Sequence, residues 1–184
     1  AMVVSSTSAM QSMYGTIHAC AKPVRKTILR PGPQPRKNDM TLSLQEISDR
    51  MEIQDLVYQY ANIIDQKRFG DLVQVFTEDA HIDYSAVGGP SGDRDTIIAF
   101  LNQVMGMFAS HQHLNANPQI KVEGDSATGR VMCFNPQELT LPDGKTHIFM
   151  VGIWYVDEYR RTDAGWKISK RVEEKSYVFN APEL

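Results

Sequence analysis

The apolar pattern of this chain changes period at His111, and that change limits the folds available to it. Before His111, apolar residues recur at three- and four-residue steps, as in amphipathic helices. After it, apolar and polar residues alternate, which is typical of strands. Three turn sequences, EGD, PDG and DAG, divide this second half. They predict four antiparallel strands, at 113–122, 126–139, 146–161 and 166–179.

Helices are predicted in the first half. One begins at a capping box, in which the Ser43 hydroxyl and the Glu46 carboxylate satisfy free N–H groups, and it runs to about Ile64. Another is expected to begin near Asp93, whose side chain can cap it, and to bury apolar residues as far as Phe108.

A short helix is expected between these two, from about Asp71 to an end at 77–79, followed by a short strand at 81–84. Three helices before a long meander predict an α+β domain, in which the helices pack on a curved, antiparallel or mixed sheet that wraps a helix and leaves a cone. Such a cone has an open mouth, where a small apolar organic ligand would be buried.

The chain is expected to divide into a basic, Pro-, Ser- and Met-rich arm at 1–41 and a domain at 42–184. Residues 1–40 carry six Lys and Arg residues against Asp39 alone. Three interpretations of this arm stay open: a transit-like leader, an expression-vector extension before a natural start near Met40, or a strap that packs on a partner.

Charge and composition limit the kinds of partner and compartment that the chain is expected to have. The net charge of −3 gives no reason to expect nucleic acid or an anionic membrane as a partner. No apolar run approaches the roughly 18 residues of a membrane span. Two cysteines, Cys20 in the arm and Cys133 in a strand pattern, make a stabilising disulfide unexpected and fit a reducing, cytoplasmic compartment.

Two side chains 48 positions apart carry the predicted chemistry. Asp65 stands at the end of the first helix, and His113 opens the first long strand pattern. A carboxylate bonded to one imidazole nitrogen fixes the tautomer and stabilises the imidazolium formed when the other nitrogen takes a proton. The spacing therefore predicts a proton-transfer pair that needs no metal or other cofactor.

Each of these residues also has a structural interpretation. Asp65 could be a solvated carboxylate at a helix end, and His113 a satisfied histidine in a strand. Arg171 lies in the run KRVEEK, where cross-strand ion pairs on a solvated strand are a simple explanation.

A metal site is weakly indicated. His111 and His113 are two positions apart, which places both rings on one face of a strand, and His147 or Asp83 could complete a set. Because H-x-H also occurs by chance and no third ligand has an informative spacing, the prediction is that no metal is bound.

Two segments carry a resemblance to a known family. FTEDAHIDY after the first helices and YRRTDAGWKISKR in the last hairpin resemble the SnoaL-like branch of the nuclear transport factor 2 superfamily, over about 42–180. Within that branch the chain is similar to scytalone dehydratases and hexachlorocyclohexane dehydrochlorinases. The resemblance implies a cone-shaped α+β barrel, an Asp–His pair and association into a dimer or trimer.

The resemblance also implies roles for single residues. Asp65 and His113 match the pair of both enzyme groups, and Tyr84 matches a dehydratase tyrosine in the sequence IDY. Arg171 matches a late-strand arginine that acts near the leaving group in the dehydrochlorinases. Tyr60 stands where the dehydrochlorinases have lysine, so neither family's substrate is assumed.

The predicted function is that of a cofactor-independent lyase or isomerase, dehydratase-like, acting on a small apolar substrate of polyketide or steroid type. Asp65, His113 and Tyr84 are the predicted catalytic residues, with Tyr84 donating to an oxygen that gains negative charge. The other predicted contacts to substrate are Tyr60, His147 and Arg171. The alternative is a non-catalytic binding or assembly module of the same fold, such as a dioxygenase small subunit.

Overall fold

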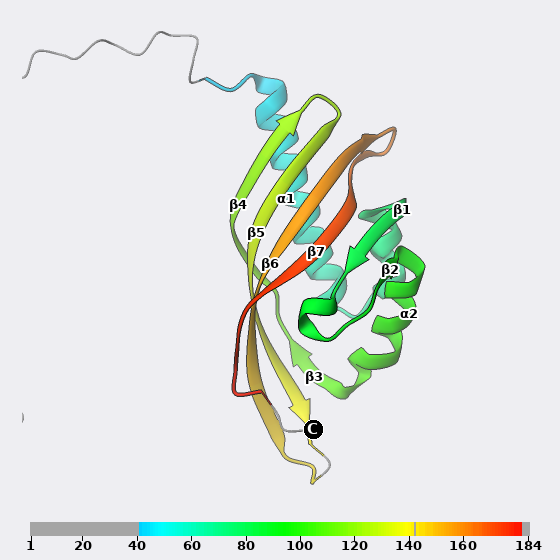
Figure 1. The fold of residues 1–184 in the computed structure, drawn as a ribbon, viewed down its shortest axis with the longest axis vertical. Coiled ribbons are helices and arrows are strands. Elements are labelled where there is room, and N and C mark those ends of the chain that lie inside the picture. The colour runs from blue at the N-terminus through cyan, green and yellow to red at the C-terminus, as the bar shows by residue number, and fades with distance from the viewer. Residues whose placement is uncertain (1–40, 142, 182–184) are drawn as a thin grey trace, which may run out of the picture. The chain divides into compact units, whose positions relative to one another are not determined.

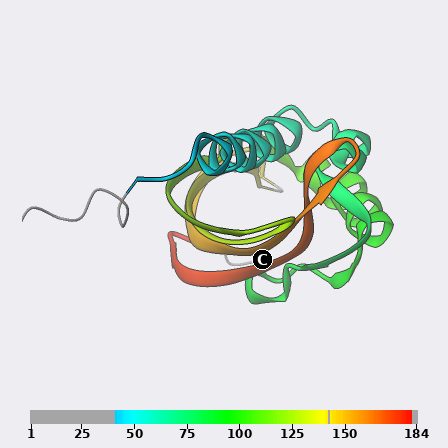
Figure 2. The same ribbon diagram turned by 90° about the horizontal axis from the view of Figure 1, so that it is seen from above.

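A long helix lies across the concave side of a curved seven-stranded sheet in the computed structural model, which describes residues 41–141 and 143–181 (Figures 1 and 2). The helix is α1 (Leu44–Asp65), and a shorter helix, α2 (Arg94–Val104), lies beside β1 (Phe76–Asp83). The predicted α+β class and curved mixed sheet are confirmed. The arm predicted at 1–41 lies outside the described residues except for its last residue.

The sheet has the order β2-β1-β7-β6-β5-β3, and β4 pairs with the other half of the same edge of β5. The pairing of β1 with β7 is parallel, and every other pairing is antiparallel. The remaining strands are β2 (Ser91–Asp93), β3 (Phe108–His111), β4 (Leu114–Glu123), β5 (Ser126–Thr140), β6 (Thr146–Thr162) and β7 (Gly165–Phe179). Three short 3-10 helices join these elements: η1 (Phe69–Gln74), η2 (Ser85–Val87) and η3 (Met105–Met107).

The four long strands agree closely with the prediction, and so do α1 and the start of α2. Ser43 caps α1 by accepting a hydrogen bond from the Glu46 N–H at 3.1 Å. Asp93 caps α2 in the same way, accepting from the Thr96 N–H at 2.8 Å. Because each cap satisfies an otherwise free N–H, it fixes where its helix begins.

Two local predictions were wrong. Residues 77–79 do not end a helix but belong to β1, because the backbone at Phe76 is already extended and paired with Ile168 of β7. The third helix ends before Phe108, which pairs with Leu139 in β3. In both places the chain forms a strand, β1 or β3, whose pairing partner lies far away in the sequence.

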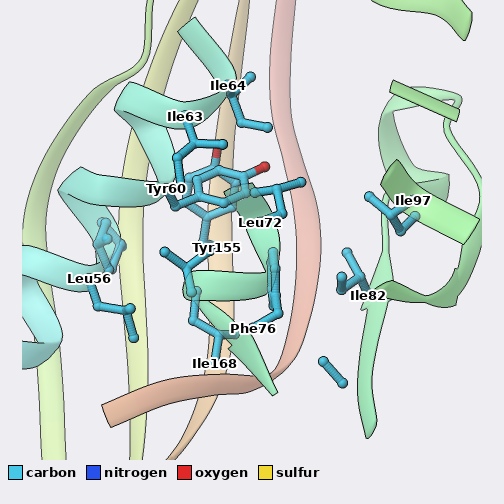
Figure 3. Close-up of a cluster of buried hydrophobic side chains, with 14 of the residues drawn as sticks. Leu56, Tyr60, Ile63, Ile64, Leu72, Phe76, Ile82, Ile97, Tyr155 and Ile168 are labelled. Carbon is cyan, nitrogen blue, oxygen red and sulfur yellow. The ribbon is translucent and has the colours of Figure 1, made fainter. Parts of the chain in front are cut away.

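The core lies between α1 and the sheet (Figure 3). Tyr60 of α1 packs edge to face against Phe76 and Tyr155, with ring centroids 5.9 and 5.7 Å away. Ile53 and Val57 extend the same buried face of α1 toward its N-terminus. This packing fixes α1 in depth and rotation, so the residue that ends the helix has a defined position. No helix within the described ranges combines the length and apolar character needed to cross a bilayer.

A fully buried ion pair joins β6 and β7 behind Tyr60. Arg171 donates from Nε and Nη2 to the two carboxylate oxygens of Asp157, at 2.8 and 2.7 Å. Its guanidinium lies over the rings of Tyr60 and Tyr155, 4.1 and 4.0 Å from the centroids. Tyr159 donates a further hydrogen bond to Asp157. The interpretation of Arg171 as a residue of a solvated strand was therefore wrong.

Replacing Asp157 by Asn should destabilise the fold strongly, because the Arg171 charge would remain buried without a counter-charge. Breaking such a pair typically costs about 3–5 kcal/mol. The loss is measured as a decrease in the free energy of unfolding, obtained from urea denaturation. Glu158→Gln is the matched control, since Glu158 pairs with Lys170 on the exposed face of the same two strands. Its unfolding midpoint should stay close to that of the wild type. Equal effects of the two changes would contradict the assignment of the buried pair.

Candidate functional site

A cavity of about 380 Å³ opens at the C-terminal end of α1. Its walls come from α1, the segment around η2, the end of α2 with η3, and the inner faces of β5, β6 and β7. Most of the lining is apolar or aromatic, and this volume is within the range of small-molecule sites. The polar side chains of the lining are those of Tyr60, Tyr84, His113, Asn135, Gln137 and Glu173.

Asp65 and His113 are in direct contact at this cavity. The Nδ1 atom of His113 lies 2.6 Å from Oδ1 of Asp65, and the backbone N–H of His113 donates to Oδ2 at 3.0 Å. Asp65 is the last residue of α1, and His113 directly precedes β4. The two bonds hold both the backbone and the ring of His113. Because the carboxylate accepts at Nδ1, the proton of a neutral ring is placed on Nδ1, and Nε2 is free to accept.

The charge of Asp65 is stabilised by His113. Burial raises the pKa of Asp65, but the hydrogen bonds and the positive charge that His113 can carry outweigh this, so the pKa lies below its usual value. Asp65 is therefore ionised at neutral pH and acts as an acceptor.

A second histidine supports the end of α1. His111 is buried, and its Nε2 donates to the carbonyl oxygen of Ile64 at 3.0 Å. Burial lowers the pKa of His111, so the ring is neutral at neutral pH. Its Nε2 lies 3.9 Å from Asp65 Oδ1, too far for a hydrogen bond. Among the described residues, no three His, Cys, Asp or Glu side chains are grouped to hold a metal ion.

Tyr60 and Tyr84 form a pair of hydroxyl groups at the cavity wall. Their oxygens are 2.6 Å apart, and both rings are almost fully buried. Burial is the largest cause that raises the pKa of both hydroxyls, so both are protonated at neutral pH. One hydroxyl donates to the other, which leaves one O–H available to a third group. A Cβ at Gly89 would lie 2.7 Å from the Tyr84 Cβ, so glycine lets this segment close over Tyr84.

His147 and Arg171 do not line the cavity, contrary to the substrate-binding roles predicted for them. His147 bonds through Nε2 to the carbonyl oxygen of Asn180, at 2.7 Å, near the far end of β7. Arg171 is held by Asp157 and is covered by two aromatic rings. The structure thus brings Asp65, His113, Tyr84 and Tyr60 together and leaves the other two outside.

Three polar residues of the cavity were missed by sequence reasoning. Asn135 donates to the Gln112 carbonyl oxygen at 2.8 Å and accepts from Gln137. Glu173 is buried on β7, where the charged run around it suggested a solvated strand. The alternation of side chains along a strand could have indicated this. Residues 171 and 173 share one face of the strand, and residues 170 and 174 share the other.

Comparisons with known proteins agree with this architecture. An uncharacterized protein of Mycobacterium tuberculosis, Rv2910c, is 46% identical over 136 residues, which are 74% of this chain and 91% of that protein. Hexachlorocyclohexane dehydrochlorinase 1 of Sphingobium indicum is 26% identical over 130 residues, 69% of this chain and 81% of the enzyme.

A solved structure shares the fold. It is that of a candidate scytalone dehydratase from Novosphingobium aromaticivorans, with a TM-score of 0.67 and 19% identity, covering 75% of this chain and 91% of the other. Residues 45–172 match the model of the SnoaL-like domain, which confirms the resemblance noted in the sequence. The chain belongs to the SnoaL-like domain family.

Proposed function

We propose that this protein is a cofactor-independent lyase that removes a proton from carbon in a small apolar substrate, with His113 as the base. The observation that carries the proposal is the contact between Asp65 and His113 at the wall of a ligand-sized cavity. A relative named as a hexachlorocyclohexane dehydrochlorinase supports the class of reaction, because removal of hydrogen chloride is an elimination.

The base is Nε2 of His113. A substrate carbon whose C–H bond is acidified by an adjacent carbonyl group gives its proton to Nε2, and the imidazolium that forms is stabilised by the Asp65 carboxylate 2.6 Å from Nδ1. General-base assistance of this kind contributes about 10²–10⁴ in rate. The apolar walls add to it, because charges interact more strongly there than in water.

Tyr84 is the proposed donor to the carbonyl oxygen. When the C–H bond breaks, negative charge moves to that oxygen, and a hydroxyl already held in place stabilises it without reorganisation. Tyr60 orients Tyr84 through the 2.6 Å contact between their oxygens. An isomerase would use the same first step and return the proton to a different carbon.

The alternative, a binding or assembly module without chemistry, has less support. It would be favoured by a cavity filled with side chains, whereas this cavity is open and is lined by His113, which is bonded to Asp65. A homo-oligomeric state and a cytoplasmic location remain predictions.

His113→Gln should abolish turnover. A panel of small apolar carbonyl compounds, incubated with the protein and read by mass spectrometry, identifies the substrates of the wild type. On these, kcat/KM should fall by about 10² or more, because glutamine cannot take up the proton. His81→Gln is the control, since His81 is exposed on β1 and bonds to Ser91 outside the cavity. Circular dichroism should show the same fold in both variants; a fully active His113→Gln protein would exclude the mechanism.

The tautomer of His113 can be tested without a substrate. Nitrogen-15 NMR of the wild type at a pH where the ring is neutral should show the proton on Nδ1, because Asp65 accepts it there. In Asp65→Asn the Nδ1-protonated form should lose its advantage, and kcat/KM should fall by about 10²-fold or more because the imidazolium has lost its counter-charge. A wild-type ring protonated only on Nε2 would contradict the proposed geometry.

A further inference from the structure

Glu173 is a buried carboxyl group at the cavity wall. It lies on β7 opposite Tyr155 of β6, its residue is 7% exposed, and it is the last buried residue of the strand. Its carboxyl group makes no hydrogen bond or ion pair with any residue in the described ranges. A buried carboxylate in this situation is unstable, so either a ligand or a proton must satisfy it.

Arg171, the cation whose charge acts on Glu173, is paired with a different carboxylate. Arg171, two residues earlier on the same face of β7, donates both Nε and Nη2 to Asp157. One guanidinium therefore faces two acidic side chains and neutralises only one of them. Burial raises the pKa of Glu173 to about 8; Arg171 lowers it, and Asp157 and Asp83 raise it. At neutral pH the Glu173 side chain is mostly a neutral acid.

The tyrosines and the cysteine around Glu173 carry no charge near neutral pH, so they offer it no counter-charge. Besides those named above, the titratable neighbours are Tyr60 on α1, Tyr84 beside η2, Tyr155 on β6, Cys133 on β5 and, across the cavity, His113. Burial raises the pKa of all three tyrosines and raises that of Cys133 to about 12, so all four are neutral. His113 faces Glu173 across the cavity.

We propose that Glu173 is the general acid of this site, and that the substrate class is therefore a β-hydroxy carbonyl compound that loses water. This inference rests on the proposed function, in which His113 is the base. It adds to it the identity of the leaving group. A halide leaves as a stable anion and needs no proton, whereas hydroxide is too basic to leave without one.

The step balances with one base and one acid. The C–H bond breaks and its proton goes to Nε2 of His113, while its electron pair forms the new C=C bond. The C–O bond breaks, and the departing oxygen takes the proton of Glu173 and leaves as water. His113 is then an imidazolium and Glu173 a carboxylate, and one proton passed from the first to the second, directly or through solvent, restores the starting state.

The protonation state of Glu173 is tested without a substrate. Carbon-13 NMR should show one carboxyl signal that titrates near pH 8 and is missing in Glu173→Gln. Because the folded-state pKa is raised, the stabilisation is complete below the unfolded pKa of about 4.3 and is lost as the pH rises toward 8. The melting temperature of the wild type should therefore fall relative to Glu173→Gln over that range and run parallel to it above. A signal that titrates in the ordinary carboxyl range would overturn the proposal.

The leaving group is tested with a matched pair of ketones. A β-hydroxy-β-aryl ketone and its β-chloro analogue give the same conjugated enone, so one absorbance assay serves both. Glu173→Gln should lower kcat/KM for the hydroxy ketone by about 10² or more and that for the chloro ketone by less than about tenfold. Glu174→Gln is the control, since Glu174 is exposed and pairs with Arg130 on the other face of β7, and both rates should be unchanged.

The remaining outcomes are distinguishable. Wild-type protein that acts on the chloro ketone alone, or on neither, would overturn the β-hydroxy carbonyl class. Glu173→Gln protein that dehydrates at the wild-type rate would remove Glu173 from the mechanism and leave His113 as the base. Loss of activity in Glu173→Gln while His113→Gln stays active would instead overturn the proposed function itself.

Discussion

The carboxylate of Asp65 joins the helix to the sheet at the point where the cavity begins. One oxygen accepts from the backbone of His113 and the other from its ring, so the end of α1 and the start of β4 are fixed relative to each other by the same group that orients the imidazole. His111 adds a third bond, to the carbonyl oxygen of Ile64, one residue before the carboxylate. The same hydrogen bonds thus fix both the position of α1 and the orientation of the His113 ring. Packing of the buried face of α1 against the sheet makes this arrangement rigid.

Much of this arrangement could be predicted from the sequence. Turn residues between the long strands fix their ends, since Gly124, Gly144 and Gly165 adopt positive φ values that other residues rarely take. The two α-helices could be predicted because the spacing of apolar residues and the capping residues Ser43 and Asp93 indicate the same starting points. Contact between Asp65 and His113 was expected from the spacing between the end of a helix and the start of a strand and from a family resemblance. The first half of β1 and all of β3 were missed because their pairing partners are far away in sequence.

The face that a charged strand residue occupies was harder to predict. The run KRVEEK is charged at every position except Val172, and nothing in its composition separates Arg171 and Glu173 from Lys170 and Glu174. Alternation along the strand separates them, but only the position of α1 and the pairing with β6 decide which face is buried. His147 shows the same limit, because its role depends on where β6 extends beyond the cavity.

Asp157 and Glu173 are buried carboxyl groups on neighbouring strands, and their different surroundings give them different roles. Asp157 has a bidentate arginine and a tyrosine hydroxyl as partners, so it is a structural anion. Glu173 makes no hydrogen bond or ion pair with another described residue and faces the cavity, so burial favours its protonated form. The register of β6 and β7 shifts beyond this point, between Gly152 and Ile153, and the residues of β7 after Glu173 are exposed. Glu173 is therefore the last position of β7 where a side chain can reach the cavity and still be shielded from water, the condition that a neutral carboxylic acid needs.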